Sequence, residues 1–151
     1  MGATLSAPYA DAVRLCAVVF VAKGIVFNLL STQARLRSGV SNFKEETSEI
    51  TGYGSKVKES GLLGNEKAVR VLGRITSNNA VNEPIFMALA IVGLSSVREL
   101  SAAPVAAFMW SRCVHNICFL FMPQIGTMAP RSVAFVTSMG AAGLLAYQLA
   151  Q

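Results

Sequence analysis

Charged and hydrogen-bonding side chains recur at helical spacing within otherwise apolar stretches of this chain. Arg112, His115 and Phe119 follow one another at spacings of three and four, which puts them on one face of a helix, and Arg131 precedes Ser132 directly. A further group has a constant spacing of four: Arg70, Arg74, Asn78 and Asn82. Arginine binds carboxylates through paired N–H donors, so these residues suit a peptide-like ligand with several carboxylates. The sequence therefore predicts a cationic, hydrogen-bonding cleft.

The composition predicts that this cleft belongs to a membrane protein. Of the 151 residues, 53% are hydrophobic and only 14% are charged, and the mean hydropathy is +0.50. A soluble domain of this size ordinarily carries about a quarter charged residues. We therefore expect a small integral membrane protein that forms a single domain over residues 1–151.

The net charge of +5 does not indicate a nucleic-acid partner. Eight of the thirteen Lys and Arg residues lie between Arg35 and Arg74, where five Glu residues accompany them, so the charges form one polar segment. We expect no nucleic acid as a partner. The chain has one histidine, which excludes a multi-histidine metal site, and we expect no metal. Its three cysteines lie in apolar stretches and are expected to be thiols.

Four apolar segments have about the ~20 residues that a bilayer-spanning helix requires. They cover residues 12–30, 74–94, 102–122 and 132–149. No alternating strand pattern of a membrane barrel is visible in the sequence. The predicted fold is an all-α integral membrane protein, a bundle of four transmembrane helices with a long polar loop over residues 31–73.

The distribution of basic residues predicts the topology. The loop over residues 31–73 carries seven basic residues, whereas the loop after the second span carries only Arg98. Positive loops face the cytosol, so the long loop is expected there and both termini on the lumenal side. The cationic cleft would then lie toward the cytosolic face. Arg35 and Arg74 could alternatively be a membrane-surface anchor and part of a solvated helix end.

The polar residues within the spans also have structural interpretations. A charge near the middle of the bilayer costs about 2.5–3.5 kcal/mol, so such residues must face other helices or water. Lys23 and Glu83 could form an intramembrane ion pair. His115, Asn28 and Asn116 could hydrogen-bond between helices.

Three segments with recognisable motifs occur in order along the chain. The first is Ala22-Lys23 followed by Ser31-Thr32-Gln33-Ala34-Arg35-Leu36-Arg37. The second, residues 74–86, fits the pattern R-x-x-x-N-x-x-E-N-x-P-x-F except at Val81. The third combines Arg112-x-x-His115 with Arg131-Ser132-Val133. Together they resemble the MAPEG superfamily, the membrane-associated proteins in eicosanoid and glutathione metabolism, and are similar to microsomal glutathione S-transferase and microsomal prostaglandin E synthase.

The resemblance implies a homotrimer in an internal membrane, with glutathione as the cofactor bound between subunits. The endoplasmic reticulum is the expected membrane, and a mitochondrial or another internal membrane is the alternative. Arg131 and Ser132 match catalytic positions that stabilise the glutathione thiolate. The matching glutathione-binding residues are Arg35, Arg74, Asn78, Arg112 and His115. The implied activity is that of a glutathione transferase or peroxidase, in which the thiol attacks a lipophilic electrophile.

Three departures from the family pattern support an alternative. Val81 stands at the position of the family's glutamate, and Phe119 and Phe135 stand where the family often has a hydroxyl-bearing aromatic residue. A catalytically degenerate member of the family, serving as a structural or regulatory subunit of a membrane assembly, is therefore the second hypothesis. A small channel or transporter has only the intramembrane charges in its favour.

Overall fold

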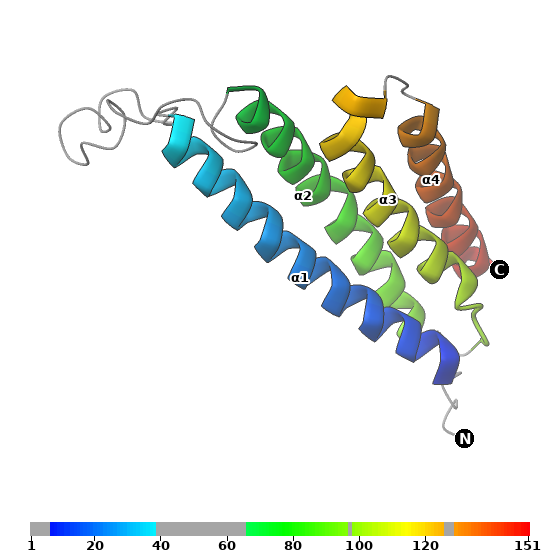
Figure 1. The fold of residues 1–151 in the computed structure, drawn as a ribbon. Helices are drawn as coiled ribbons and strands as arrows, with labels where there is room; N and C mark the ends of the chain where they lie inside the picture. The colour runs from blue at the N-terminus through cyan, green and yellow to red at the C-terminus, as the bar shows by residue number, and fades with distance from the viewer. Residues whose placement is uncertain (1–6, 39–65, 97, 126–128) are drawn as a thin grey trace. The chain divides into compact units, whose positions relative to one another are not determined.

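The computed structural model describes residues 7–38, 66–96, 98–125 and 129–151. Every regular element in these ranges is a helix, so the all-α prediction is confirmed for this part of the chain. The helices are α1 (Ala7–Ser38), α2 (Glu66–Leu94), α3 (Ala103–Ile125) and α4 (Ala129–Ala150) (Figure 1).

The helices extend beyond the apolar segments that the sequence indicates. α1 continues through Ser38 and α2 starts at Glu66, so both ends of the expected polar loop over residues 31–73 are helical. Residues such as Gln33, Ala34 and Arg35 favour a helix, and a helix can continue past the apolar layer where water solvates its side chains. The rest of that loop, residues 39–65, lies outside the described residues.

The described residues pack as two compact units, and α1 and α2 contribute to both. One unit comprises residues 23–79. In this unit α1 buries Phe27, Ser31 and Ala34, which are spaced at four and three. α2 buries Leu72 and Ile75. Each helix therefore has one inward face, as the spacing of a helix requires.

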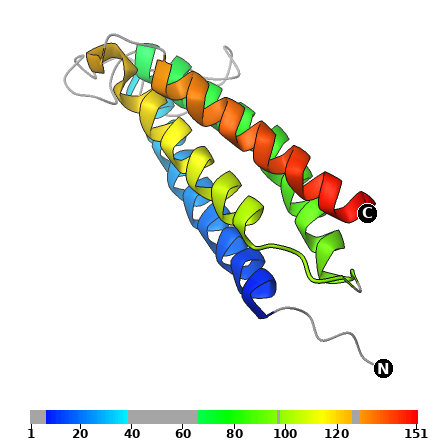
Figure 2. The ribbon, with the colours of Figure 1, turned by 90° about the vertical axis from the view of Figure 1, so that its right-hand side faces the viewer.

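The other unit comprises residues 1–22 and 80–151 and contains most of the apolar core. Within it α3 and α4 lie side by side (Figures 1 and 2). Phe108 of α3 stacks on Phe86 of α2, with ring centroids 3.7 Å apart and planes 3° from parallel. Phe20 of α1 meets the same Phe108 edge-on at 6.0 Å. Phe86, the last residue of the second motif, therefore packs in the core.

α1 is attached to α2 within this unit by a polar contact at one end. The hydroxyl of Tyr9 donates a hydrogen bond of 2.9 Å to the backbone carbonyl of Ala90. Gly93 lies against the same tyrosine, since a Cβ atom there would come 2.8 Å from Tyr9 Cζ and from Leu100 Cδ1. A larger residue at position 93 would not fit.

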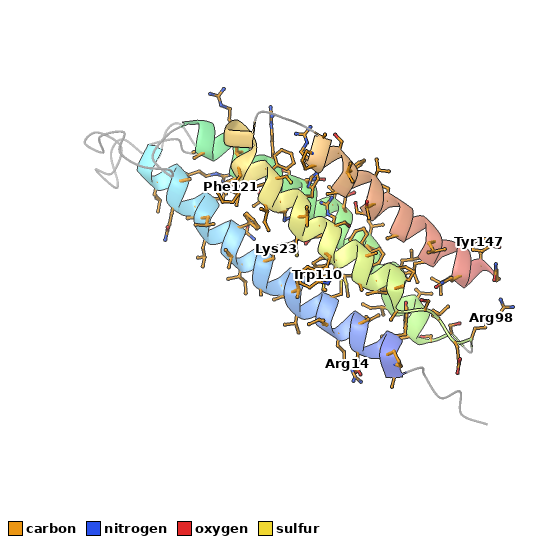
Figure 3. All side chains as sticks on the ribbon, turned by 45° about the vertical axis from the view of Figure 1, so that its right-hand side comes forward. Arg14, Lys23, Arg98, Trp110, Phe121 and Tyr147 are labelled. Atoms are coloured by element: carbon orange, nitrogen blue, oxygen red, sulfur yellow. The ribbon has the colours of Figure 1, made fainter. Side chains whose placement is uncertain are left out.

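Large apolar side chains cover the outward faces of the helices. On α1 they include Leu15, Val18 and Val21, and Trp110 and Phe121 are exposed on α3 (Figure 3). In the described residues, α1 over Ala7–Leu36 and all of α4 are long and apolar enough to cross a membrane. α2 and α3 carry charged residues within their apolar sequences, Glu83 in α2 and Arg112 in α3.

The three cysteines are thiols that form no disulfide among the described residues, as the sequence predicts. Cys16 and Cys118 are buried and Cys113 is partly buried.

Candidate functional site

The first turn of α4 combines two features that favour an anion. The helix begins at Ala129, so Arg131 and Ser132 lie in its first turn, where no acidic residue is present. The N–H groups of a first turn have no carbonyl partner within the helix, and together they act as a partial positive charge. Arg131 is partly buried there and Ser132 is exposed. The guanidinium, the hydroxyl and the helix terminus can all stabilise negative charge.

An aromatic ring of α3 contacts this arginine, and further rings of α3 and α4 adjoin it. The Cζ atom of Arg131 lies 4.9 Å from the ring centroid of Phe119, in cation–π geometry. His115 meets the same phenylalanine ring edge-on, with centroids 5.0 Å apart and planes at 73°. Phe135 lies 6.2 Å from the His115 ring. We call these four residues, His115, Phe119, Arg131 and Phe135, the α3–α4 cluster.

Arg112 lies in a different environment from Arg131, although both are predicted site residues. Its side chain is fully buried, with 0% exposed, and its Nε atom lies 4.0 Å from Oε1 of Glu83 in α2. Glu83 is itself 7% exposed. Burying a charge in an apolar interior is costly unless an opposite charge accompanies it, so each of these residues offsets the charge of the other.

Asn116 lies one turn beyond Arg112 on α3 and is 1% exposed. Neither its amide oxygen nor its amide nitrogen has a hydrogen-bond partner among the described residues. The expectation that Asn116 hydrogen-bonds between helices is therefore wrong for this part of the chain. Asn28, for which the same role was expected, is exposed on α1.

Three of the predicted glutathione-binding residues belong to the unit over residues 23–79. Arg35 is partly buried on α1, and on α2 Asn78 is partly buried and Arg74 is exposed. The four remaining predicted residues, Arg112, His115, Arg131 and Ser132, belong to the other unit. Of these four, the structure brings His115 and Arg131 together through the ring of Phe119.

The sequence did not predict that Glu83 would be the partner of Arg112, although a signal was available. Glu83 lies eleven residues before Leu94, where α2 ends, and Arg112 lies nine residues after Ala103, where α3 begins. In an antiparallel helix pair these positions differ in depth by about 3 Å, at 1.5 Å per residue. The pairing of Glu83 with Lys23 stays a prediction, since Lys23 belongs to the other unit.

Glu83 does not supply the carboxylate that the second motif lacks at position 81. Val81, at the family's glutamate position, is 60% exposed on the outside of α2. Glu83, two residues later, is buried against Arg112. The two positions therefore lie on different faces of the helix, and Glu83 does not replace the missing side chain.

Comparisons with known proteins identify the family. The MAPEG family model matches residues 13–151, which include all four helices except the first turn and a half of α1. The chain therefore belongs to the MAPEG family, whose members are membrane-associated, and the resemblance seen in the motifs is confirmed at this level. No curated protein and no solved structure matches the chain. The similarity to microsomal glutathione S-transferase and microsomal prostaglandin E synthase stays a prediction.

Proposed function

We propose that this MAPEG-family protein is a glutathione-dependent transferase or peroxidase of an internal membrane. It activates the thiol of glutathione for attack on a lipophilic electrophile that reaches the site from the bilayer. The observation that carries the proposal is the α3–α4 cluster. It holds the guanidinium of Arg131 at the positive end of α4, beside the exposed hydroxyl of Ser132.

The chemistry follows from the charge of this site. The thiolate, not the thiol, is the nucleophile, and a nearby cation lowers the free energy of the thiolate. Arg131 and the terminus of α4 supply positive charge, and Ser132 can donate a hydrogen bond to the sulfur. The thiol proton passes to water, and the activated sulfur then forms a bond to the electrophilic atom of the second substrate. In a substitution the leaving group departs with the electron pair of the bond that breaks; in an addition the electron pair of the opened double bond takes up a proton from water.

Membrane insertion is supported by the outward faces of the helices. Soluble proteins rarely expose large contiguous apolar surfaces, whereas α1 exposes Leu15, Val18 and Val21 on its outside. Four spanning helices with the segment over residues 39–65 in the cytosol fit both this surface and the excess of basic residues in the loop. The polar residues Glu83 and Arg112 do not argue against insertion of α2 and α3, because they face each other.

A homotrimer in the endoplasmic reticulum membrane is part of the proposal. Glutathione would bind between subunits near the cytosolic face, where Arg35, Arg74 and Asn78 would bind its carboxylate and amide groups. His115 and Arg112 would complete the site, His115 through the α3–α4 cluster and Arg112 from the protein interior. The second substrate would be a lipophilic small molecule that dissolves in the bilayer.

The test is glutathione binding to the purified protein in detergent, measured by calorimetry beside Arg131→Ala. A ligand at a hundred times its dissociation constant stabilises the native state by about 2.7 kcal/mol, so thermal unfolding provides a second readout. We expect wild-type binding and weaker binding in the variant, followed by conjugation of electrophiles in an activity panel.

The possible outcomes separate the enzyme from the degenerate family member. Glutathione binding without conjugation of any electrophile in the panel would contradict the transferase. No binding at millimolar glutathione would contradict the glutathione site as a whole. Co-purification with other membrane proteins at fixed stoichiometry would then favour a structural or regulatory subunit, consistent with Val81, Phe119 and Phe135.

A further inference from the structure

Asn116 carries a buried amide group that has no partner in the described part of the protein. The side chain is 1% exposed, and neither Oδ1 nor Nδ2 has a hydrogen-bond partner among the described residues. Two buried hydroxyls of α3 and α4 are, in contrast, satisfied within their own helices. Ser111 donates to the Phe108 carbonyl at 2.9 Å. Ser138 donates to the Phe135 carbonyl at 2.7 Å. Asn116 therefore retains two N–H donors and an acceptor that its helix does not use.

Asn116 lies beside predicted glutathione-binding residues on the inward face of α3. It follows His115 directly and lies one helical turn after Arg112, and both of these side chains are buried. Phe119, whose ring contacts Arg131, lies three residues further along the same face. The amide is therefore one helical turn from the ring that contacts the proposed thiolate-stabilising arginine.

An amide with an unused donor and an unused acceptor is complementary to a peptide group. Its N–H can donate to the peptide carbonyl, and its oxygen can accept from the peptide N–H, whereas a carboxylate or a thiolate offers no donor. Glutathione contains two peptide groups, and the proposed function provides one asparagine, Asn78, for them. A buried polar group without a partner is costly, so a ligand that satisfies the amide of Asn116 recovers this cost on binding.

We propose that Asn116 binds a peptide group of glutathione and thereby selects a peptide thiol over a simple thiol. The proposal rests on the proposed function, in which glutathione occupies the site at the α3–α4 cluster. Because the amide is buried in the ligand-free protein, the ligand must displace a side chain to reach it. Phe135 is 41% exposed, and its ring lies 6.2 Å from that of His115, the residue before Asn116. Displacement of this ring is the expected entry step.

The first test uses the wild-type protein with two analogues of glutathione, in each of which an ester oxygen replaces one peptide N–H. Calorimetry in detergent measures the dissociation constants. The ester removes the donor from which the amide oxygen of Asn116 would accept. We therefore expect one analogue to bind about tenfold more weakly than glutathione. Equal affinities for glutathione and both analogues would overturn the proposal, and this test decides it even if no variant of Asn116 folds.

The second test is Asn116→Leu, which keeps the branched arrangement of side-chain heavy atoms and removes the polar groups. We expect glutathione to bind about tenfold to a hundredfold more weakly, since its peptide group then lies against a side chain that offers no hydrogen bond. The weaker analogue should lose its disadvantage in this variant, as a double-mutant cycle requires. The ligand-free variant should melt at a higher temperature than the wild type. A residue with only a structural role would not combine higher stability with weaker binding.

Ser138→Ala is the matched control. Ser138 lies nine residues after the start of α4 and Asn116 nine residues before the end of α3, so the two lie at about the same depth. Ser138 is 0% exposed, and its hydroxyl already donates within α4. Its replacement should lower the melting temperature slightly and leave the affinity for glutathione unchanged.

The outcomes distinguish failure of this inference from failure of the proposed function. If Arg131→Ala weakens glutathione binding and Asn116→Leu does not, the proposed function stands and Asn116 takes no part in binding. A lower melting temperature of ligand-free Asn116→Leu would mean that the amide is satisfied before glutathione binds, which overturns this inference alone. If the wild type binds no glutathione, the proposed function fails and this inference fails with it.

Discussion

Oε1 of Glu83 lies 4.0 Å from Nε of Arg112, and both side chains are buried between α2 and α3. The pair joins a residue of the second motif to a residue of the third. It explains how a fully buried arginine is tolerated in an apolar unit, because its charge is offset by a carboxylate at nearly the same depth.

Because the two charges of this pair offset each other, single and double substitutions should change the free energy of unfolding by different amounts. Removal of one partner leaves a buried charge without its counterion, so we expect Glu83→Gln to lower the free energy of unfolding by about 3–5 kcal/mol. Replacing both residues, as in Glu83→Gln with Arg112→Met, should recover most of that loss. Unfolding in detergent checks both values. Asp11→Asn breaks the exposed pair with Arg14, at 3.2 Å, and should have no measurable effect. Equal losses in the single and the double variant would contradict the pairing.

The buried amide group of Asn116 is expected to lower the stability of the folded protein. Its amide is 1% exposed, and among the described residues neither polar atom has a hydrogen-bond partner. A buried polar group without a partner costs about 1–3 kcal/mol, and leucine has the same branched arrangement of side-chain heavy atoms without the polar groups. We therefore expect Asn116→Leu to raise the unfolding temperature. Ser111→Ala is the contrasting variant, because it removes a satisfied hydrogen bond of 2.9 Å to the Phe108 carbonyl and should lower that temperature slightly. A destabilised Asn116→Leu would mean that the amide is satisfied in the folded protein.

Gly93 is expected to tolerate no side chain. A Cβ atom there would come within 2.8 Å of Tyr9 Cζ and Leu100 Cδ1, and closer still to the tyrosine hydroxyl. Gly93→Ala should therefore displace Tyr9, break its hydrogen bond to Ala90, and cost about 1–3 kcal/mol of stability. Gly140→Ala is the matched control, since a Cβ atom at that helical position meets nothing within 4 Å. It should be neutral or slightly stabilising, because alanine favours a helix over glycine. Thermal melting curves of the two variants test this prediction, and equal melting temperatures would contradict it.

A carboxylate at position 81 would restore the complete second motif. If glutathione binds as proposed, Val81→Glu should raise its affinity by roughly tenfold to a hundredfold, because a charge-assisted hydrogen bond to the ligand's amino group contributes roughly 1.5–3 kcal/mol. Calorimetric titration measures this directly. Val92→Glu places the same charge at an equally exposed position of α2 outside the motif, and it should bring no gain. Equal effects of the two variants would show that only net charge matters.

Some parts of the site could be predicted from the sequence because they depend on local spacing. Arg112, His115 and Phe119 were expected on one helix face, and the structure buries the first two and joins the last two by ring contact. The expected fourth span starts at residue 132, whereas α4 begins at Ala129, so Arg131 and Ser132 lie in its first turn. The family could also be predicted, because the three motifs and their order along the chain are visible in the sequence without a structure.

Other parts depend on which helices lie side by side and at what depth. The sequence alone presented Glu83 as a candidate partner for Lys23, and it placed Phe119 on one helix face with Arg112 and His115. The structure places Glu83 against Arg112, because α2 and α3 bring these two positions to nearly the same depth, while the pairing with Lys23 stays a prediction. The guanidinium of Arg131 lies over the ring of Phe119, because α3 and α4 lie side by side at that level. Helical periodicity fixes the face on which a residue lies, and therefore the sequence by itself determined the helices, their polar faces and the family. The partner across that face is set by the packing of whole helices, so only the tertiary structure decided that Arg112 lies against Glu83 and that Arg131 lies against Phe119.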